Sequence, residues 1–229
     1  MQILIDIGIL FVGYLIGSIP FGLLIVKLKT GKDIRDVESG RTGGTNAVRA
    51  AGFWAGLLTA ILDILKGAGA VWLAQATSPE NHLIHVLSPV GAILGHNYSV
   101  FLISRDKDGK LRFHGGAGGA PALGGAMGLW PLMGPIVFGA GALVWFTLGI
   151  ASVTTMAIGL VVTIVFAIRA YLGFQNPVDI LYGVLALFLL FWSLRPNIRK
   201  LMNGEERVVS VSLNGWLRAR KQNKETSEK

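Results

Sequence analysis

The chain has 229 residues, of which 52% are hydrophobic and only 15% charged, with a mean hydropathy of +0.57 and a net charge of +8. Soluble globular domains carry about 25% charged residues, so the composition excludes an ordinary soluble domain and favours one compact membrane domain. The chain has no cysteine and no HExxH pair, and its basic segments are not interleaved with aromatic residues. We therefore expect no metal site and no nucleic-acid partner.

Apolar residues are grouped in blocks along the chain. A helix that spans a bilayer needs about 20 apolar residues, or fewer where surrounding protein shields it. Pro20 lies inside the first block, where a kink is tolerated, and two X-Pro turns separate the fourth block from the fifth. The sequence therefore predicts an all-α integral membrane protein with seven transmembrane helices, at 3–26, 53–76, 83–103, 118–133, 135–148, 151–171 and 178–194.

Basic residues predict the orientation of these helices. Of the 21 Lys and Arg, all but Lys66 and Arg169 lie in residues 27–49, 104–114 and 195–229. Even numbers of predicted spans separate the three segments, so they share one face, which the positive-inside rule makes cytoplasmic. We expect the N-terminus outside and the C-terminus in the cytoplasm, with residues 1–207 forming one polytopic domain and 208–229 a basic cytoplasmic tail.

Two cytoplasmic segments are rich in glycine, one from Ser39 to Arg49 and the other from Phe113 to Pro121. Glycine lets successive N–H groups turn towards one point, where they form an anion-binding nest. Hydroxyl and guanidinium groups nearby suit phosphate. The residues leave a second interpretation open, in which these segments are tight turns between closely packed membrane helices.

Polar residues inside the predicted spans also need an explanation. Asp63 and Lys66 are one helical turn apart, which predicts an ion pair that either stabilises the bundle or belongs to a site. His96 and Asn97 lie in the third predicted span, where hydrogen bonding between helices is the alternative to a role in binding.

Several motifs in a fixed order point to a known family. They are Gly17-Ser18-Ile19-Pro20-Phe21-Gly22, Asp33-Ile34-Arg35, Ser39-Gly40, Gly43-Gly44-Thr45-Asn46, Arg49, Asp63, Lys66-Gly67, Gly95-His96-Asn97-Tyr98-Ser99-Val100-Phe101, Gly115-Gly116, Gly118, Arg195, Asn197-Ile198, Leu201 and Gly204-Glu205. Over about residues 5–207 the chain resembles the bacterial acyl-phosphate:glycerol-3-phosphate acyltransferases, the PlsY family. The resemblance implies an enzyme of the bacterial plasma (inner) membrane, a monomer that uses no cofactor. It would transfer a fatty acyl group from acyl phosphate to the 1-hydroxyl of glycerol 3-phosphate, giving lysophosphatidic acid for phospholipid synthesis.

The resemblance also implies roles for individual residues. Ser39, Arg49 and Asn197 would carry the reaction. The substrate phosphate would be bound by Gly40, Gly43, Gly44, Thr45, Asn46, His96, Asn97, His114, Gly115, Gly116 and Gly118.

This chain departs from the family pattern at motif positions. Arg41 stands where the first loop usually has Asn and Gly44 where it has Ala, while His114 and Ala117 replace two lysines of the second loop and Leu194 replaces a histidine. Replacement charge could come from Arg41, Lys107, Lys110, Arg112 or His114. Ala117 and Leu194 leave open a non-catalytic paralogue that binds phosphorylated lipid precursors or a partner. Asp63 and Lys66 inside a predicted span leave open a small transporter or channel built on the same helices.

Overall fold

A computed structural model describes residues 1–227, with side chains as far as residue 220, so residues 228–229 of the predicted tail lie outside it. The helices are α1 (Gln2–Ser18), α2 (Phe21–Thr30), α3 (Gly44–Ala51), α4 (Phe53–Thr77), α5 (His82–Asn97), α6 (Gly119–Leu129), α7 (Met133–Leu148), α8 (Ala151–Tyr171), α9 (Val178–Ser193), α10 (Arg195–Met202) and α11 (Leu213–Ser227). The described residues also contain two 3₁₀ turns, η1 (Ile34–Asp36) and η2 (Val100–Leu102), and two strands, β1 (Ile103–Arg105) and β2 (Leu111–Phe113).

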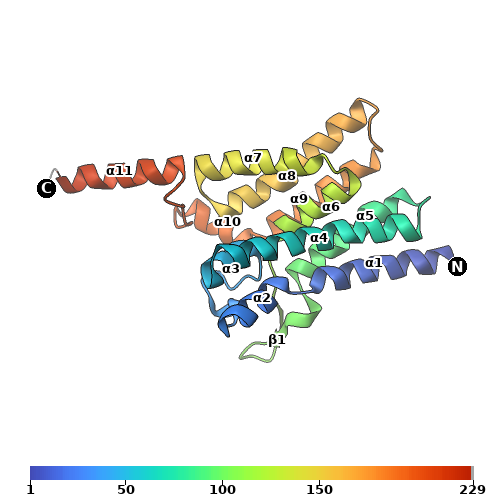
Figure 1. Ribbon diagram of the computed structural model, residues 1–229, viewed down its shortest axis with the longest axis horizontal. Helices are drawn as coiled ribbons and strands as arrows, with labels where there is room; N and C mark the ends of the chain where they lie inside the picture. Colours follow the sequence, from blue (N-terminus) through green and yellow to red (C-terminus); the bar gives the residue numbers. More distant parts are fainter. Residues whose placement is uncertain (228–229) are drawn as a thin grey trace.

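The long helices lie along a common axis (Figure 1). The N-terminus is at one end of this bundle, and α2, α3, α10 and α11 are at the other (Figure 1). A core of apolar side chains from α5 to α9 surrounds the fully buried Phe166 and Tyr182. The Tyr182 hydroxyl donates to Ala122 O on α6 (2.6 Å), which satisfies its polar end inside that core.

Within residues 1–227, three apolar helices are long enough to cross a bilayer by themselves: Gln2–Thr30 taken through its break, Phe53–Thr77 and Ala151–Tyr171. A fourth candidate is α9 joined to α10 across a bend of 64°. Length and composition thus indicate three or four spans. The seven spans and the outward N-terminus remain predictions.

The structure differs from the predicted helices in three places. The block at 3–26 is divided, because α1 ends at Ser18 and α2 begins after Pro20. The block at 83–103 gives a helix only as far as Asn97, and the all-α prediction missed the hairpin that follows. The fourth span is reduced to the 11 residues of α6, about 16 Å at 1.5 Å per residue, against a hydrocarbon core of about 30 Å.

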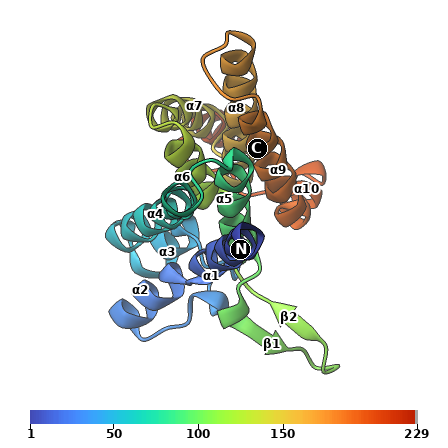
Figure 2. The same cartoon turned by 90° about the vertical axis from the view of Figure 1, so that its right-hand side faces the viewer.

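The hairpin forms because the sequence supplies a turn. Ile103 pairs with Phe113 and Arg105 with Leu111 in an antiparallel register. Asp106 Oδ1 accepts the N–H of Lys110 (2.9 Å) in the connecting turn, where Gly109 has φ +75°. Figure 2 shows the hairpin standing away from the helices.

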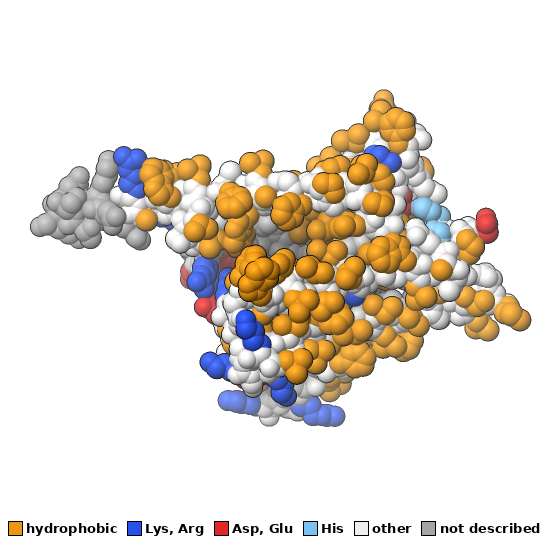
Figure 3. Space-filling view, in the orientation of Figure 1, with side chains coloured by type: hydrophobic (Ala, Val, Ile, Leu, Met, Phe, Trp, Pro, Cys, Tyr) orange, Lys and Arg blue, Asp and Glu red, His pale blue; other side chains and the backbone are white. Residues whose placement is uncertain are grey.

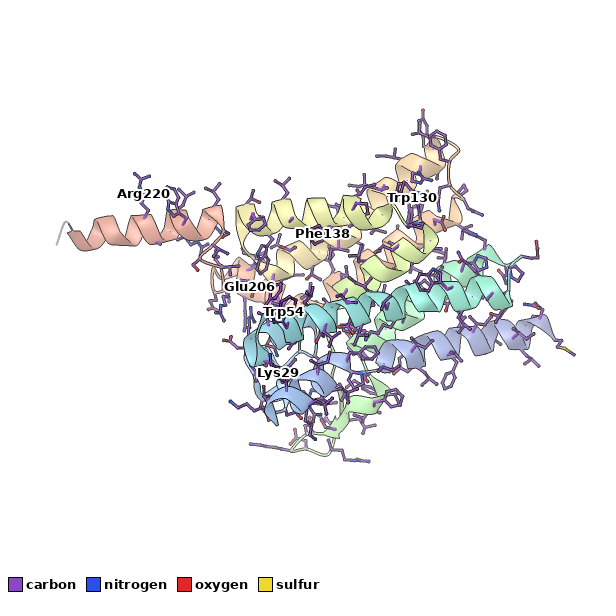
Figure 4. All side chains as sticks on the ribbon, viewed as in Figure 1. Lys29, Trp54, Trp130, Phe138, Glu206 and Arg220 are labelled. Carbon is purple, nitrogen blue, oxygen red and sulfur yellow. The ribbon has the colours of Figure 1, made fainter. Side chains whose placement is uncertain are left out.

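Apolar side chains remain exposed on the outer faces of the helices, as a lipid-facing surface requires. They cover the flank of the bundle in Figure 3, while Lys and Arg gather towards the end where α2, α3 and the hairpin lie. Phe138, 75% exposed on α7, is one of them (Figure 4).

Candidate functional site

The two glycine-rich loops meet at one end of the bundle. The Thr42 N–H donates to Gly115 O (3.2 Å), which joins the first loop to the second. The Gly116 N–H in turn donates to His96 O (2.8 Å), so the second loop is fixed to the last turn of α5. A Cβ on Gly115 would lie 2.2 Å from His96 O, so only glycine permits this approach. The loops therefore form one structure rather than two separate turns.

Asn46 organises the first loop. Its buried Nδ2 lies 3.1 Å from Ile34 O, 2.9 Å from Val37 O and 2.9 Å from Arg41 O. These contacts hold the loop against the first turn of α3, which starts after Gly43. Its Oδ1 has no partner among the described residues. The amide is thus engaged by backbone, and its predicted contact with substrate stays a prediction.

Arg41 occupies the point where the loops reach α9 and α10. Its Nη1 donates to Gly116 O (3.1 Å) and to Ser193 Oγ (3.0 Å). Its Nη2 donates to Ser193 O (2.7 Å) and to Asn197 Oδ1 (3.2 Å). Burial lowers the pKa of Arg41 from its ordinary value, yet a guanidinium stays charged at neutral pH. One cation therefore ties together both loops and the α9–α10 junction.

Asn197 is fixed from its other side by an acid. The Asn197 Nδ2 donates to Glu206 Oε1 (3.0 Å), which also accepts from Ser152 Oγ on α8 (2.7 Å). Arg41 and Glu206 thus hold the two ends of one amide, which sets its orientation. Figure 4 places Glu206 at the same end of the molecule as Lys29, Trp54 and Arg220.

A charged cluster lies under the second loop, inside the bundle. Lys66 Nζ is 2.9 Å from Asp63 Oδ1, so the structure contains the ion pair that the spacing predicts, with only 3% and 2% of the two side chains exposed. Lys66 also donates to Ile19 O at the α1–α2 break (3.1 Å) and to His96 Nδ1 (2.8 Å). Because an ammonium only donates, we assign the His96 proton to Nε2. That nitrogen faces Gly116, where a Cβ would lie 1.9 Å away.

Three predicted site residues are exposed around the loops: Ser39, Thr45 and Arg49. The Arg41 N–H lies 3.4 Å from Ser39 Oγ, near the limit for a hydrogen bond. Arg49, in the last turn of α3, forms no ion pair within the described residues. Its guanidinium is therefore available to a ligand.

Other predicted residues line the second loop or turn away from it. Gly118 has φ +90° and precedes α6, and a Cβ there would lie 2.7 Å from Asn97 Oδ1. Asn97 is 5% exposed, and neither polar atom of its amide has a partner among the described residues. By contrast, His114 Nε2 lies 2.8 Å from Ser104 Oγ on the hairpin. His114 is thus engaged on β1 rather than at the loop junction.

Sequence reasoning did not select Ser193 or Glu206, and it named Arg41 only as one of several possible cations. The sequence did contain a signal for Glu206, because this residue directly follows Gly204-Glu205, the last of the family motifs given above. Nothing in the sequence distinguishes Ser193 from other serines that end a helix.

Comparisons with known proteins agree on one family. A family model described as glycerol-3-phosphate acyltransferase matches residues 7–204. The proteins of that name from Rubrobacter xylanophilus and Rhodopseudomonas palustris are 34% and 36% identical to this chain. These alignments cover 89% and 90% of this chain and 95% and 96% of the relatives.

Two solved structures share the fold. The crystal structure of PlsY, an integral membrane glycerol 3-phosphate acyltransferase, in its glycerol 3-phosphate form matches with a TM-score of 0.76 and 28% identity, over 89% of this chain and 95% of that one. Its lysophosphatidic acid form matches with a TM-score of 0.74 and 26% identity, over 90% and 96%. The chain therefore belongs to the glycerol-3-phosphate acyltransferase family of integral membrane proteins, PlsY.

Proposed function

We propose that this protein transfers a fatty acyl group from acyl phosphate to the 1-hydroxyl of glycerol 3-phosphate. The observation that supports this function most directly is the junction of the two glycine-rich loops through Thr42 and Gly115, closed on its other side by Asn197. The Arg41 guanidinium and the Ser193 hydroxyl lie at this junction. Groups of these two kinds bind phosphate, and glycine-rich loops can add backbone N–H donors.

The reaction needs positioning and charge stabilisation rather than a covalent intermediate. The 1-hydroxyl oxygen forms a bond to the acyl carbon, and the bond from that carbon to the phosphate oxygen breaks. The hydroxyl proton leaves with the departing inorganic phosphate. Phosphate is a good leaving group, so holding both substrates in line and neutralising the developing charge supply most of the rate.

The proposed roles of the residues follow from their places. The exposed Ser39 and Arg49 bind and orient substrate phosphate from the first loop. Gly115, Gly116 and Gly118 form the other side of the phosphate cradle. Asn197, whose amide is already oriented, lies beside the reacting hydroxyl.

We also propose seven spans in a bacterial plasma membrane, with the N-terminus outside and the site on the cytoplasmic face. The basic segments gather at the end of the bundle that holds the site, opposite the N-terminus (Figures 1 and 3). This arrangement gives the site access to both a water-soluble acceptor and an acyl chain in the bilayer.

The test of this function is an assay in detergent. We expect the purified protein to release phosphate and form lysophosphatidic acid from hexadecanoyl phosphate and glycerol 3-phosphate, and to use hexadecanoyl-CoA poorly. We expect Asn197→Ala to lower kcat about 10²-fold, as removal of one positioned donor does. Asn203→Ala, at the exposed end of the same helix, is the matched control and should keep wild-type kcat.

Two results would contradict the proposal. Absence of product from either donor, with the protein folded, would favour the non-catalytic paralogue. Flux of a solute through liposomes without any product would favour the transporter.

A further inference from the structure

Arg41 stands apart from the other cations that could serve the loop junction. Arg105 donates to Gly109 O on the hairpin turn (3.1 Å), and Arg112 pairs with Asp106 (3.3 Å). Lys107 and Lys110 are exposed on that hairpin. With His114 bound to Ser104, Arg41 is the candidate among those named from the sequence that contacts both the second loop and α10.

Within the part of the chain that the structure describes, no acidic side chain forms a hydrogen bond or ion pair with Arg41. All four of its hydrogen bonds go to neutral oxygens, on Gly116, Ser193 and Asn197. No carboxylate lies within ion-pair distance of it among the described residues, and the nearby Glu206 is engaged by Asn197 and Ser152. A partly buried cation whose contacts are all neutral is costly, and an anion would offset that cost.

A second, independent observation also points to a missing ligand. Asn97 is 5% exposed, and its amide has no partner among the described residues. Buried polar groups normally have a partner, so a lone one needs an explanation. The Asn97 amide lies against Gly118, which is two residues after Gly116, whose carbonyl Arg41 contacts. Helix α6 begins directly after Gly118, and its first N–H groups have no partners within the helix.

We infer that Arg41 binds the substrate phosphate in this protein and so supplies, from the first loop, the positive charge that Ala117 does not supply from the second. The inference rests on the proposed function for the identity of the substrate, but not for the binding of phosphate. The Arg41 Nε–H donates to no described residue, so it is available to a phosphate oxygen. The Arg41 contact with Asn197 Oδ1 is the longest of the four, at 3.2 Å, and a phosphate oxygen that replaces it gives Arg41 a two-point contact with the ligand. The Asn197 amide is then still held by Glu206, while its Oδ1 becomes available to the acceptor hydroxyl.

The experiment measures thermal unfolding of the purified protein in detergent with inorganic phosphate, glycerol 3-phosphate or glycerol. We expect the two phosphates to raise the wild-type Tm and glycerol to leave it unchanged, because a ligand that binds only the folded state stabilises it. In Arg41→Asn, the concentration of phosphate that gives half the shift should rise about tenfold to hundredfold, the usual loss for a charged hydrogen bond.

Two further variants separate binding from structure. Arg41→Asn combined with Ala117→Lys returns a cation to the other loop, and it should recover most of the phosphate-dependent shift. Arg207→Gln removes a cation that pairs with Glu38 on the surface, and it should keep the wild-type response.

Unchanged phosphate protection in Arg41→Asn would overturn the inference. So would a failure of both the single and the double variant to fold, because Arg41 would then be a structural tie between the loops. Turnover is not needed for this measurement. A protein that binds phosphate through Arg41 but makes no product would contradict the proposed reaction and support the binding site.

Discussion

Asp63 and Lys66 form a buried pair on α4, and its stability depends on both partners. Lys66 also reaches the carbonyl at the α1–α2 break and the ring of His96. The imidazole of His96 lies 3.6 Å from Asp63, so Lys66 is the closest positive charge to that carboxylate. Removal of the lysine alone would leave an ionised group in a nonpolar interior, which costs more than removal of the pair.

We therefore predict that Lys66→Met lowers the free energy of unfolding by about 3–5 kcal/mol, the range found for a buried pair broken on one side. The double variant Asp63→Leu with Lys66→Met should lose much less, because it leaves no unpaired charge. Thermal or denaturant unfolding in detergent measures both. A double variant as unstable as the single one would show that the pair itself, or its link to Ile19, is needed.

At the scale of the helices, α1 and α5 approach each other through glycine. A Cβ on Gly17 would lie 2.1 Å from Ala92 O and 2.5 Å from Ala92 Cα, both of which are backbone atoms that cannot rotate away. In the same way, a Cβ on Gly95 of α5 would lie 2.1 Å from Tyr14 O of α1. Because α5 ends in the His96-Asn97 pair beneath the loops, this approach also positions the site.

Gly17→Val should therefore push α1 from α5 and cost at least about 1–3 kcal/mol, the usual penalty for overpacking. Gly8→Val is the matched control on the same helix, since a Cβ there meets nothing within 4 Å. We expect Gly8→Val to keep the wild-type Tm. Equal effects of the two substitutions would show that α1 and α5 are not in this close contact.

At the scale of the whole molecule, charge is separated along the bundle axis. The loops, α10 and α11 lie at one end with Lys29 and Arg220, while Trp130 lies towards the other (Figure 4). Arg169 is an exception, stacked 3.7 Å from the centre of the Trp130 ring. Cations at one end favour a cytoplasmic orientation of that end.

The absence of cysteine makes this orientation directly testable. Cysteine introduced at Glu80, in the exposed α4–α5 turn, should react with an impermeant maleimide in intact cells. Cysteine at Asp108 on the hairpin should react only after the cells are opened. Labelling of both positions from the same side would contradict the one span, containing α5, that we predict between this turn and the hairpin.

The sequence alone determined the membrane class, the family and most helix positions, because long apolar blocks and ordered motifs are local features that can be recognised in the sequence itself. It also predicted the Asp63–Lys66 pair, since i and i+3 always share a helix face. Other features depend on contacts between distant segments. The end of α5 at Asn97 is stabilised by hydrogen bonds to the second loop, and no local sequence pattern predicts these bonds. Likewise, only the tertiary structure decided that Arg41 reaches the junction while His114 does not, because the Arg41–Asn197 contact joins residues 156 positions apart in the chain.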